Sequence, residues 1–191
     1  EPRAYAGVEW QVVRRLIHTS ADFELLELVS FHPAAVEAGV AALRGGCTIV
    51  SDTEMARAGM PMRRLEPLGC EVRCLMQDPR VAARAAEESS TRARAAVDLA
   101  VEGLSPSIFV IGNAPTALLR LLELVNEGRS LPALIIGMPV GFVNAAESKD
   151  LLMAQKTIPY ITIRGRKGGS ALAATALNAL ADAALQQSRG A

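Results

Sequence analysis

The stretch Ile108-Phe109-Val110-Ile111-Gly112-Asn113-Ala114-Pro115 places an unbroken apolar run directly before a glycine turn. The same order recurs twice downstream, at residues 133–141 and at residues 160–170. Short, continuous apolar runs that end in turn residues are typical of strands buried on both faces, as in a parallel sheet. The recurrence therefore predicts three parallel strands, each followed by a glycine-bearing turn.

Working outward from these strands, the remaining chain alternates between apolar runs and amphipathic stretches. The strands that we expect are Cys47–Ser51, Val72–Met76, Ser107–Ile111, Ala133–Gly137 and Tyr160–Arg164. The helices that we expect are Val8–Ile17, Pro33–Arg44, Thr53–Ala58, Val81–Glu102, Ala114–Glu127, Ala145–Gln155 and about Ser170 to Gln186. This alternation predicts an α/β fold: a single three-layer α/β/α domain over residues 1–191, with a mostly parallel, Rossmann-like sheet of about five strands. We expect residues 1–20 to form an N-terminal helical segment that leads to His18.

The carboxyl ends of parallel strands meet at one edge of a sheet, and open α/β sheets bind ligands there. Glycine lets the backbone approach a ligand closely, and the N-termini of the helices that follow favour anionic groups. The same edge carries four basic residues, namely Lys149, Arg164, Arg166 and Lys167. Because arginine and lysine bind carboxylates and phosphates, we expect an anionic small molecule as the ligand.

The composition excludes several classes of protein. The chain has 191 residues, of which 50% are hydrophobic, and 20 Lys plus Arg balance 20 Asp plus Glu. A net charge of zero argues against general nucleic-acid binding. No apolar run is long enough to span a membrane, and no signal-peptide pattern opens the chain, so we expect a cytoplasmic protein. The three cysteines and two histidines lack the spacing of zinc ligands, so no metal site is predicted.

His18 is the first candidate for chemistry, because imidazole donates and accepts protons near neutral pH. From the pattern alone, the simpler interpretation is a histidine that interacts with the dipole at the end of its helix. His32 precedes Pro33 and is expected to help start the next helix. Asp52 either caps the helix that follows it or contacts a ligand. Thr91 and Arg92 lie in a polar stretch, where a solvated arginine is the ordinary case.

Several familiar catalytic and cofactor sites are absent from the sequence. The turn at 112–114 is not the dinucleotide-binding G-x-G-x-x-G, and no acidic residue ends the next strand to bind a ribose. There is no phosphate-binding G-x-x-x-x-G-K-[ST] loop and no G-x-S-x-G nucleophile elbow. A nucleotide-binding Rossmann-like module therefore remains the weakest of the alternatives.

Four segments together resemble the precorrin-8X methylmutase and cobalt-precorrin-8 methylmutase family. They are Leu16–Asp22, Gly112–Leu118, Gly137–Lys149 and Arg164–Ser170, and the residues Ser51–Met55 and Ala58–Met60 also match. The run GMPVGFVNAAESK at 137–149 is the most specific of these. The resemblance covers nearly the whole chain in the same order.

The resemblance implies an isomerase of cobalamin (vitamin B12) biosynthesis that uses no cofactor. Family members move a methyl group from C-11 to C-12 of the corrinoid ring, a formal 1,5-sigmatropic shift that gives hydrogenobyrinic acid, or cobyrinic acid when cobalt is present. By resemblance, His18 is the catalytic residue and donates a proton or hydrogen bond to the ring-C region. The substrate-binding residues that it implies are Thr91, Arg92, Gly112, Asn113, Ala114, Met138, Gly141, Phe142, Val143, Lys149 and Arg166.

The resemblance also implies the partners. They are the corrinoid substrate and product, a second copy of the chain in a homodimer with the site near the interface, and the next enzyme of the pathway for product handover. The alternative function is a non-catalytic corrinoid-binding carrier on the same scaffold. His18, inside an otherwise matching site, favours the enzyme over the carrier.

Overall fold

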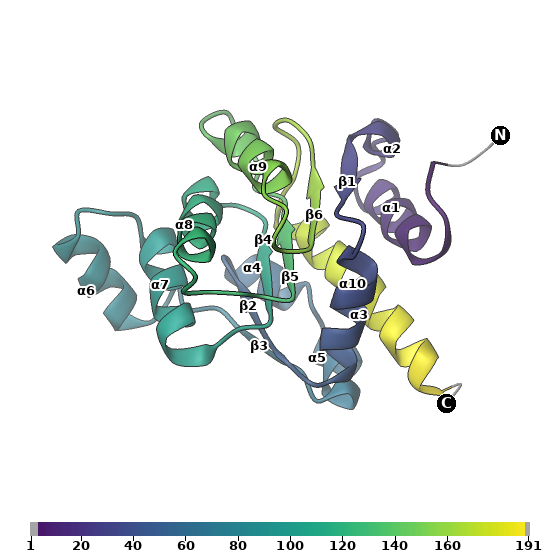
Figure 1. The fold of residues 1–191 in the computed structure, drawn as a ribbon, viewed down its shortest axis with the longest axis horizontal. Helices are drawn as coiled ribbons and strands as arrows, with labels where there is room; N and C mark the ends of the chain where they lie inside the picture. The colour runs from purple at the N-terminus through teal and green to yellow at the C-terminus, as the bar shows by residue number, and fades with distance from the viewer. Residues whose placement is uncertain (1–3, 190–191) are drawn as a thin grey trace.

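The computed structural model describes residues 4–189, which form one sheet with helices on both faces (Figure 1). Residues 1–3 and 190–191 of the predicted domain lie outside the described residues. The strands of the described chain are β1 (Val29–Phe31), β2 (Thr48–Ser51), β3 (Glu71–Arg73), β4 (Ile108–Ile111), β5 (Leu134–Gly137) and β6 (Tyr160–Ile163). They are arranged in the order β1-β6-β5-β4-β2-β3, and every pair from β6 to β3 is parallel. The predicted α/β class with a mostly parallel sheet is confirmed.

The sheet has one strand more than the apolar pattern predicts. β1 pairs antiparallel with β6, with Val29 opposite Ile163 and Phe31 opposite Ile161. Its three residues place Ser30 between Val29 and Phe31, so no continuous apolar run marks it in the sequence. An antiparallel edge strand on an otherwise parallel sheet is a common arrangement.

The central strands divide their side chains between two hydrophobic cores. In β4, Ile108 and Val110 belong to one core, whereas Phe109 and Ile111 belong to the other, and all four are buried. The alternation follows from the period of two residues along a strand. Both faces of the sheet therefore need a covering layer of helices.

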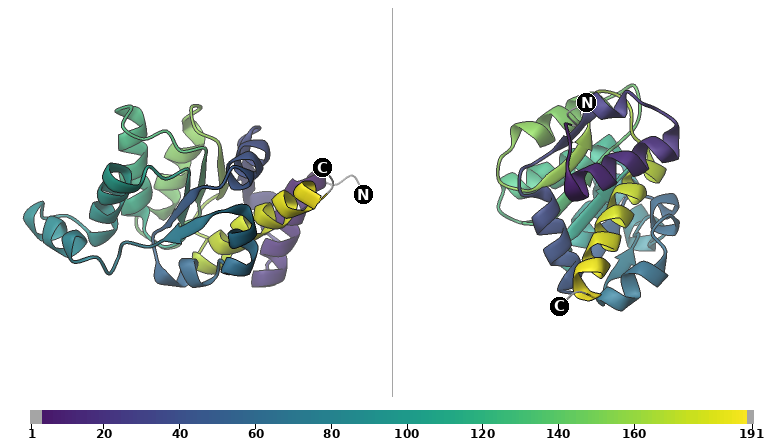
Figure 2. Two further views of the ribbon diagram at one scale, coloured as in Figure 1. Left: turned by 90° about the horizontal axis from the view of Figure 1, so that it is seen from below. Right: turned by 90° about the vertical axis from the view of Figure 1, so that its right-hand side faces the viewer.

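The helices of the described chain are α1 (Gly7–Ser20), α2 (Leu25–Leu28), α3 (Ala35–Arg44), α4 (Glu54–Ala58), α5 (Met62–Leu65), α6 (Pro79–Glu87), α7 (Arg92–Leu104), α8 (Pro115–Asn126), α9 (Ala145–Ala154) and α10 (Ser170–Arg189), with a 3-10 turn η1 at Glu66–Leu68. One face of the sheet is covered by α1, α3 and α10, and the other by α7, α8 and α9 (Figures 1 and 2). Buried alanines along α10, such as Ala173, Ala176 and Ala179, let neighbouring helices pack closely. None of the described helices is long and apolar enough to cross a membrane.

The single helix predicted over Val81–Glu102 is wrong, because the chain forms α6 and α7 with a turn between them. Ser89 adopts a φ of 49° at the break, and Thr91 then starts α7 by accepting a hydrogen bond from the Arg94 N–H at 3.2 Å. A threonine side chain at this position satisfies a backbone donor that has no partner inside the helix. As a result α6 projects from the body of the molecule beyond α7 (Figures 1 and 2).

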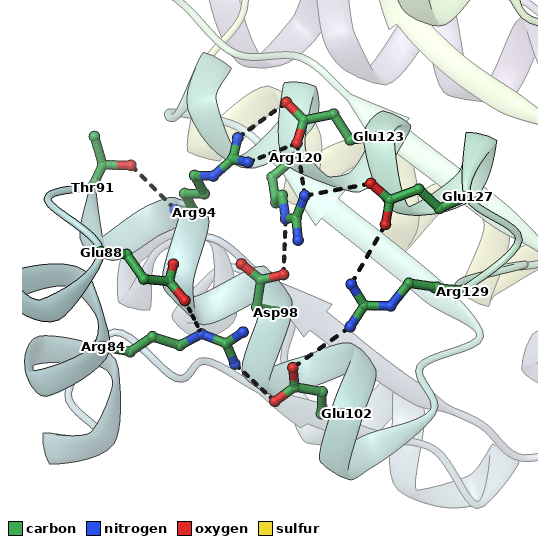
Figure 3. A network of polar contacts seen from close by, with 10 residues as sticks. All are labelled: Arg84, Glu88, Thr91, Arg94, Asp98, Glu102, Arg120, Glu123, Glu127 and Arg129. Carbon is green, nitrogen blue, oxygen red and sulfur yellow. Dashed lines mark hydrogen bonds and ion pairs between the residues drawn. The ribbon is translucent and has the colours of Figure 1, made fainter.

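A network of arginines and acidic residues ties α6, α7 and α8 together (Figure 3). At its centre Arg120 donates to the buried carboxylate of Asp98 at 2.8 Å. Arg94 makes two bonds to Glu123, at 3.0 and 2.7 Å. Removing one partner of the buried Arg120–Asp98 pair leaves an uncompensated charge and costs about 3–5 kcal/mol. The network therefore fixes the start of α7, where Thr91 and Arg92 lie.

Candidate active site

The three predicted glycine turns pack against one another at the carboxyl edge of the sheet. The Gly169 N–H donates to the Met138 carbonyl at 2.9 Å, and the Gly141 N–H donates to the Arg166 carbonyl at 3.3 Å. A Cβ atom added to Gly168 would lie 2.1 Å from the Met138 carbonyl oxygen, which no side chain permits. Glycine at 168 is therefore required for the second and third turns to meet.

The first turn is held by Asp52 rather than left open for a ligand. The Asp52 carboxylate accepts hydrogen bonds from the N–H groups of Gly112 at 3.0 Å, Asn113 at 2.8 Å and Ala114 at 2.7 Å. Burial raises the pKa of this carboxyl, while the three N–H donors act in the opposite direction. These three N–H groups are therefore engaged by a carboxylate of the protein itself.

Asp52 also does not cap the helix that follows it. The Thr53 hydroxyl does so, accepting from the Ala56 N–H at 3.1 Å, and it lies 2.8 Å from the Ser170 hydroxyl at the start of α10. The interpretation of Asp52 as a helix cap is therefore wrong. His32, in contrast, does support the start of α3 as predicted, because its Nδ1 accepts from the Ala34 N–H at 3.2 Å.

Two of the residues expected to bind substrate have buried side chains. Met138 packs into the core below the sheet edge. Lys149 is fully buried, and its ammonium donates to the Lys167 carbonyl at 2.6 Å. Burial lowers the pKa of Lys149 to about 8. In this position Lys149 supports the third turn from beneath, and its charge does not reach solvent.

The second turn instead exposes an apolar surface above the sheet edge. Phe142 is 85% exposed and Val143 is 77% exposed. The Arg166 guanidinium from the third turn lies over the Phe142 ring, 5.9 Å from its centroid. Large apolar side chains in such positions mark ligand or protein contact surfaces. Here the surface combines an aromatic ring with a cation on two neighbouring turns.

The start of α7 brings another cation to the first turn. The Thr91 hydroxyl donates to the Thr116 hydroxyl at 3.0 Å. This bond joins the start of α7 to the start of α8, directly after the first glycine turn. Arg92 follows it and is exposed, and among residues 4–189 no ion pair engages its guanidinium. Arg94, two residues on, is held by Glu123 in the network of Figure 3. Of these two arginines, Arg92 is the one available to a ligand.

His18 lies exposed in the last turn of α1, beside a hollow of about 250 Å³ between α1, α5 and α10. The hydroxyls of Thr19 and Thr175 lie 3.2 Å apart in its wall. Just beyond the helix, Asp22 accepts a hydrogen bond from the Lys167 ammonium at 2.6 Å. This bond joins the segment that carries His18 to the third glycine turn.

The hollow beside His18 also contains residues that the sequence did not single out as site residues. Arg15, Arg64, Thr175 and Asn178 line it together with His18 and Thr19. The basic pair Arg63-Arg64 is visible in the sequence, but no motif connects it to His18. Only the packing of α5 against α10 places Arg64 there. No cluster of His, Cys, Asp and Glu within the described residues could hold a metal ion.

With this geometry established, comparison with known proteins gives the family. A family model for precorrin-8X methylmutase matches residues 1–183. The chain belongs to the precorrin-8X methylmutase family. Among its relatives, the cobalt-precorrin-8 methylmutase of Leptospira interrogans is 44% identical, covering 94% of this chain and 84% of the relative. The precorrin-8X methylmutase of a Sinorhizobium species is 47% identical, covering 93% of this chain and 84% of the relative.

The structure agrees with this assignment. The crystal structure of the precorrin-8X methylmutase of Thermus thermophilus superposes with a TM-score of 0.90 at 46% identity, covering 97% of this chain and 89% of that one. The resemblance drawn from the sequence motifs is thus confirmed. The chain is an enzyme of the methylmutase family, an isomerase that acts in cobalamin biosynthesis. Both the metal-free and the cobalt-containing substrate names occur among its relatives.

Proposed function

We propose that the carboxyl edge of the sheet binds precorrin-8X or its cobalt form and moves the methyl group from C-11 to C-12 of the ring. The observation that carries this proposal is the ion pair between Asp22 and Lys167, which fixes the His18 segment against the exposed turns of that edge. The reaction breaks one carbon–carbon bond and forms another within the same molecule. It therefore needs no external donor of electrons or of a methyl group.

In this proposal His18 donates a proton or a hydrogen bond to the ring-C region as the methyl group migrates. A positioned acid that stabilises developing charge contributes typically 10²–10⁴-fold to a rate. The exposed position of His18 beside a hollow gives a bound ligand direct access to its imidazole. A change of His18→Ala is expected to abolish turnover and to leave corrinoid binding largely intact.

The surrounding residues supply binding energy. Phe142 and Val143 offer an apolar surface to the flat ring, while Arg92 and Arg166 pair with carboxylate arms on its periphery. Asn113 and Ala114 would contact the ring or its arms through atoms other than their N–H groups, because those groups donate to the Asp52 carboxylate. Gly112 and Gly141 keep the turns free of side chains, and Thr91 positions Arg92. Met138 and Lys149 support the turns from below.

We further propose that the working form is a homodimer in the cytoplasm. The exposed Phe142 and Val143 lie at an open sheet edge, and a second copy could supply the opposite wall of the ring site. The same open edge of the sheet would also let the next enzyme of the pathway receive the product. Sedimentation of the protein with and without hydrogenobyrinic acid tests the dimer.

The second candidate, a corrinoid carrier, uses the same surface without chemistry. The nucleotide-binding alternative is disfavoured, because the Asp52 carboxylate occupies the N–H groups that a phosphate would need. The deciding experiment is an absorbance assay with precorrin-8X and, separately, cobalt-precorrin-8. Rearrangement changes the ring's conjugation, so a spectral shift reports turnover. Binding without conversion of either compound would favour the carrier and contradict the methylmutase.

A further inference from the structure

The hollow beside His18 has a size that the methyl shift itself does not explain. Its volume is about 250 Å³, below the range of roughly 300–1,000 Å³ that holds a drug-sized ligand. A corrinoid ring is larger than such a ligand and does not fit inside. A single side arm of the ring does, and His18 in the wall places that arm next to the reacting region.

The charges around the hollow favour an anionic arm. Arg15 and Arg64 both pair with the same carboxylate, that of Asp182, with the Arg64 Nε at 2.9 Å from Asp182 Oδ1. Two guanidinium groups thus share one carboxylate, which leaves a net positive charge. Because each guanidinium carries five N–H donors, most of them remain for a second carboxylate.

Asn178 is an uncharged residue of the wall with one polar atom that has no partner. Asn178 donates from Nδ2 to the Gly59 carbonyl at 2.7 Å, which fixes the orientation of its amide. Its Oδ1 is buried and accepts no hydrogen bond among the described residues. An amide oxygen only accepts hydrogen bonds, so this atom does not bind a carboxylate, and the donors available to an anionic arm are those of Arg15 and Arg64.

We infer that this hollow binds one carboxylate arm of the corrinoid through Arg15 and Arg64, and so sets the rotation of the ring relative to His18. The inference rests on the proposed function. The arms of the macrocycle are chemically alike, so a flat apolar surface alone would accept the ring in several rotations. The two arginines in the hollow beside the imidazole select one of these rotations, because a guanidinium group holds a carboxylate in a defined direction. Arg15 and Arg64 are positioning residues in this scheme.

The test compares Arg64→Gln with Arg63→Gln as a matched control. Arg63 is the neighbouring residue on α5, it is exposed, and it makes no ion pair within residues 4–189. The probe is hydrogenobyrinic acid, titrated by absorbance, together with derivatives in which single carboxylates are converted to amides. We expect Arg64→Gln to weaken binding of the acid about 10-fold or more, since hydrogen bonds to charged groups contribute about 1.5–3 kcal/mol. Arg63→Gln is expected to bind like the wild type.

The amide series identifies the arm. We expect the wild type to bind one derivative about 10-fold more weakly than the parent acid, and Arg64→Gln to bind that derivative and the acid alike. Equal binding by Arg64→Gln and Arg63→Gln, or an equal loss for every derivative, would overturn the inference. The proposed function would survive either result, because it fails only if the wild type converts neither substrate.

A second variant separates ligand binding from a purely structural ion pair. Asp182→Asn releases both Arg15 and Arg64 from their shared carboxylate. If the arginines bind an arm, the affinity for hydrogenobyrinic acid is unchanged or higher in this variant, even where thermal unfolding shows lower stability. If they serve only to hold α1 and α5 on α10, affinity falls as it does in Arg64→Gln, and the inference is wrong.

Discussion

The Nζ atom of Lys167 lies 2.6 Å from Oδ2 of Asp22 and 2.7 Å from Oε2 of Glu24, so one ammonium joins the third glycine turn to the chain just beyond His18. The hydrogen bond from Lys167 lowers the pKa of Asp22. The link positions two parts of the site that are far apart in the sequence. The position of the His18 imidazole therefore depends on the position of the third glycine turn, which carries Arg166 and Lys167.

A Lys167→Met change is expected to reduce kcat on the order of 10-fold, because a small displacement of a catalytic group has a large effect on rate. Stability should change little, since the pair is partly exposed to solvent and such pairs contribute at most about 1 kcal/mol. Steady-state rates with the wild type's substrate, beside Lys156→Met as an exposed control lysine, provide the measurement. A rate equal to that of Lys156→Met would contradict the coupling.

The pH dependence of this link follows from the direction of the Asp22 shift. Because the pKa of Asp22 is lower in the folded state, its stabilisation is complete above the unfolded value of about 3.9. The stabilisation is lost as the pH falls through the lower folded-state pKa. The link is therefore intact at neutral pH, where the enzyme is expected to work.

Asp52 is expected to be the most sensitive carboxylate for stability at the sheet edge. Asp52→Ala leaves the N–H groups of Gly112, Asn113 and Ala114 without their acceptor. The Gly112 N–H is buried and the other two are partly exposed, and an unsatisfied buried donor costs about 1–3 kcal/mol, so the free energy of unfolding should fall by about that amount. Urea denaturation measures it, with the exposed Glu37→Gln expected to stay within about 0.5 kcal/mol of the wild type. Equal stability of the two variants would show that the turn does not depend on Asp52.

Asp52 also illustrates what the sequence could and could not predict. The apolar runs at 108–111 and 134–137 predict buried parallel strands, because only such strands are apolar at every position. The sequence also shows that Asp52 directly follows a predicted strand. Its three hydrogen bonds, however, reach 60 or more positions along the chain, and no local pattern encodes such a contact.

The residues of the candidate site, too, could be predicted only in part from the sequence. Motif resemblance indicated His18, Arg92 and the turns, and the structure brings the turns together. Resemblance did not separate exposed residues from buried ones, so Lys149 was grouped with the substrate-binding cations although it is fully buried. Burial depends on the packing of α9 against β6, which the apolar periodicity of either element alone does not reveal.

Lys149 should make stability depend on pH in the alkaline range. Its pKa is lowered to about 8 by burial, against about 10.4 in the unfolded chain. Between these values the unfolded state binds more protons, so the contribution of Lys149 to stability rises as the pH increases from about 8 to about 10.4. Lys149→Met removes this contribution. The difference in Tm between wild type and Lys149→Met should therefore shift in favour of the wild type over that range, and a constant difference would contradict the buried ammonium.

The last prediction concerns Arg92 and Arg94, two arginines in the first turn of the same helix with different surroundings. Arg92 is exposed without an ion pair in the described chain, whereas Arg94 makes two bonds to Glu123 (Figure 3). Arg92→Ala is expected to weaken corrinoid binding about 10-fold and to leave the free energy of unfolding unchanged.

Arg94→Ala is expected to do the reverse, lowering stability by up to about 1 kcal/mol, because the pair is partly exposed, and keeping the affinity. Titration with hydrogenobyrinic acid and urea denaturation of both variants give the two readouts. Since the residues share a helix turn and a charge, opposite outcomes would show that surroundings, not residue type, decide which cation binds the substrate. Unchanged affinity in Arg92→Ala would instead place Arg92 on the solvated surface and move the carboxylate contacts to Arg166 and the hollow beside His18.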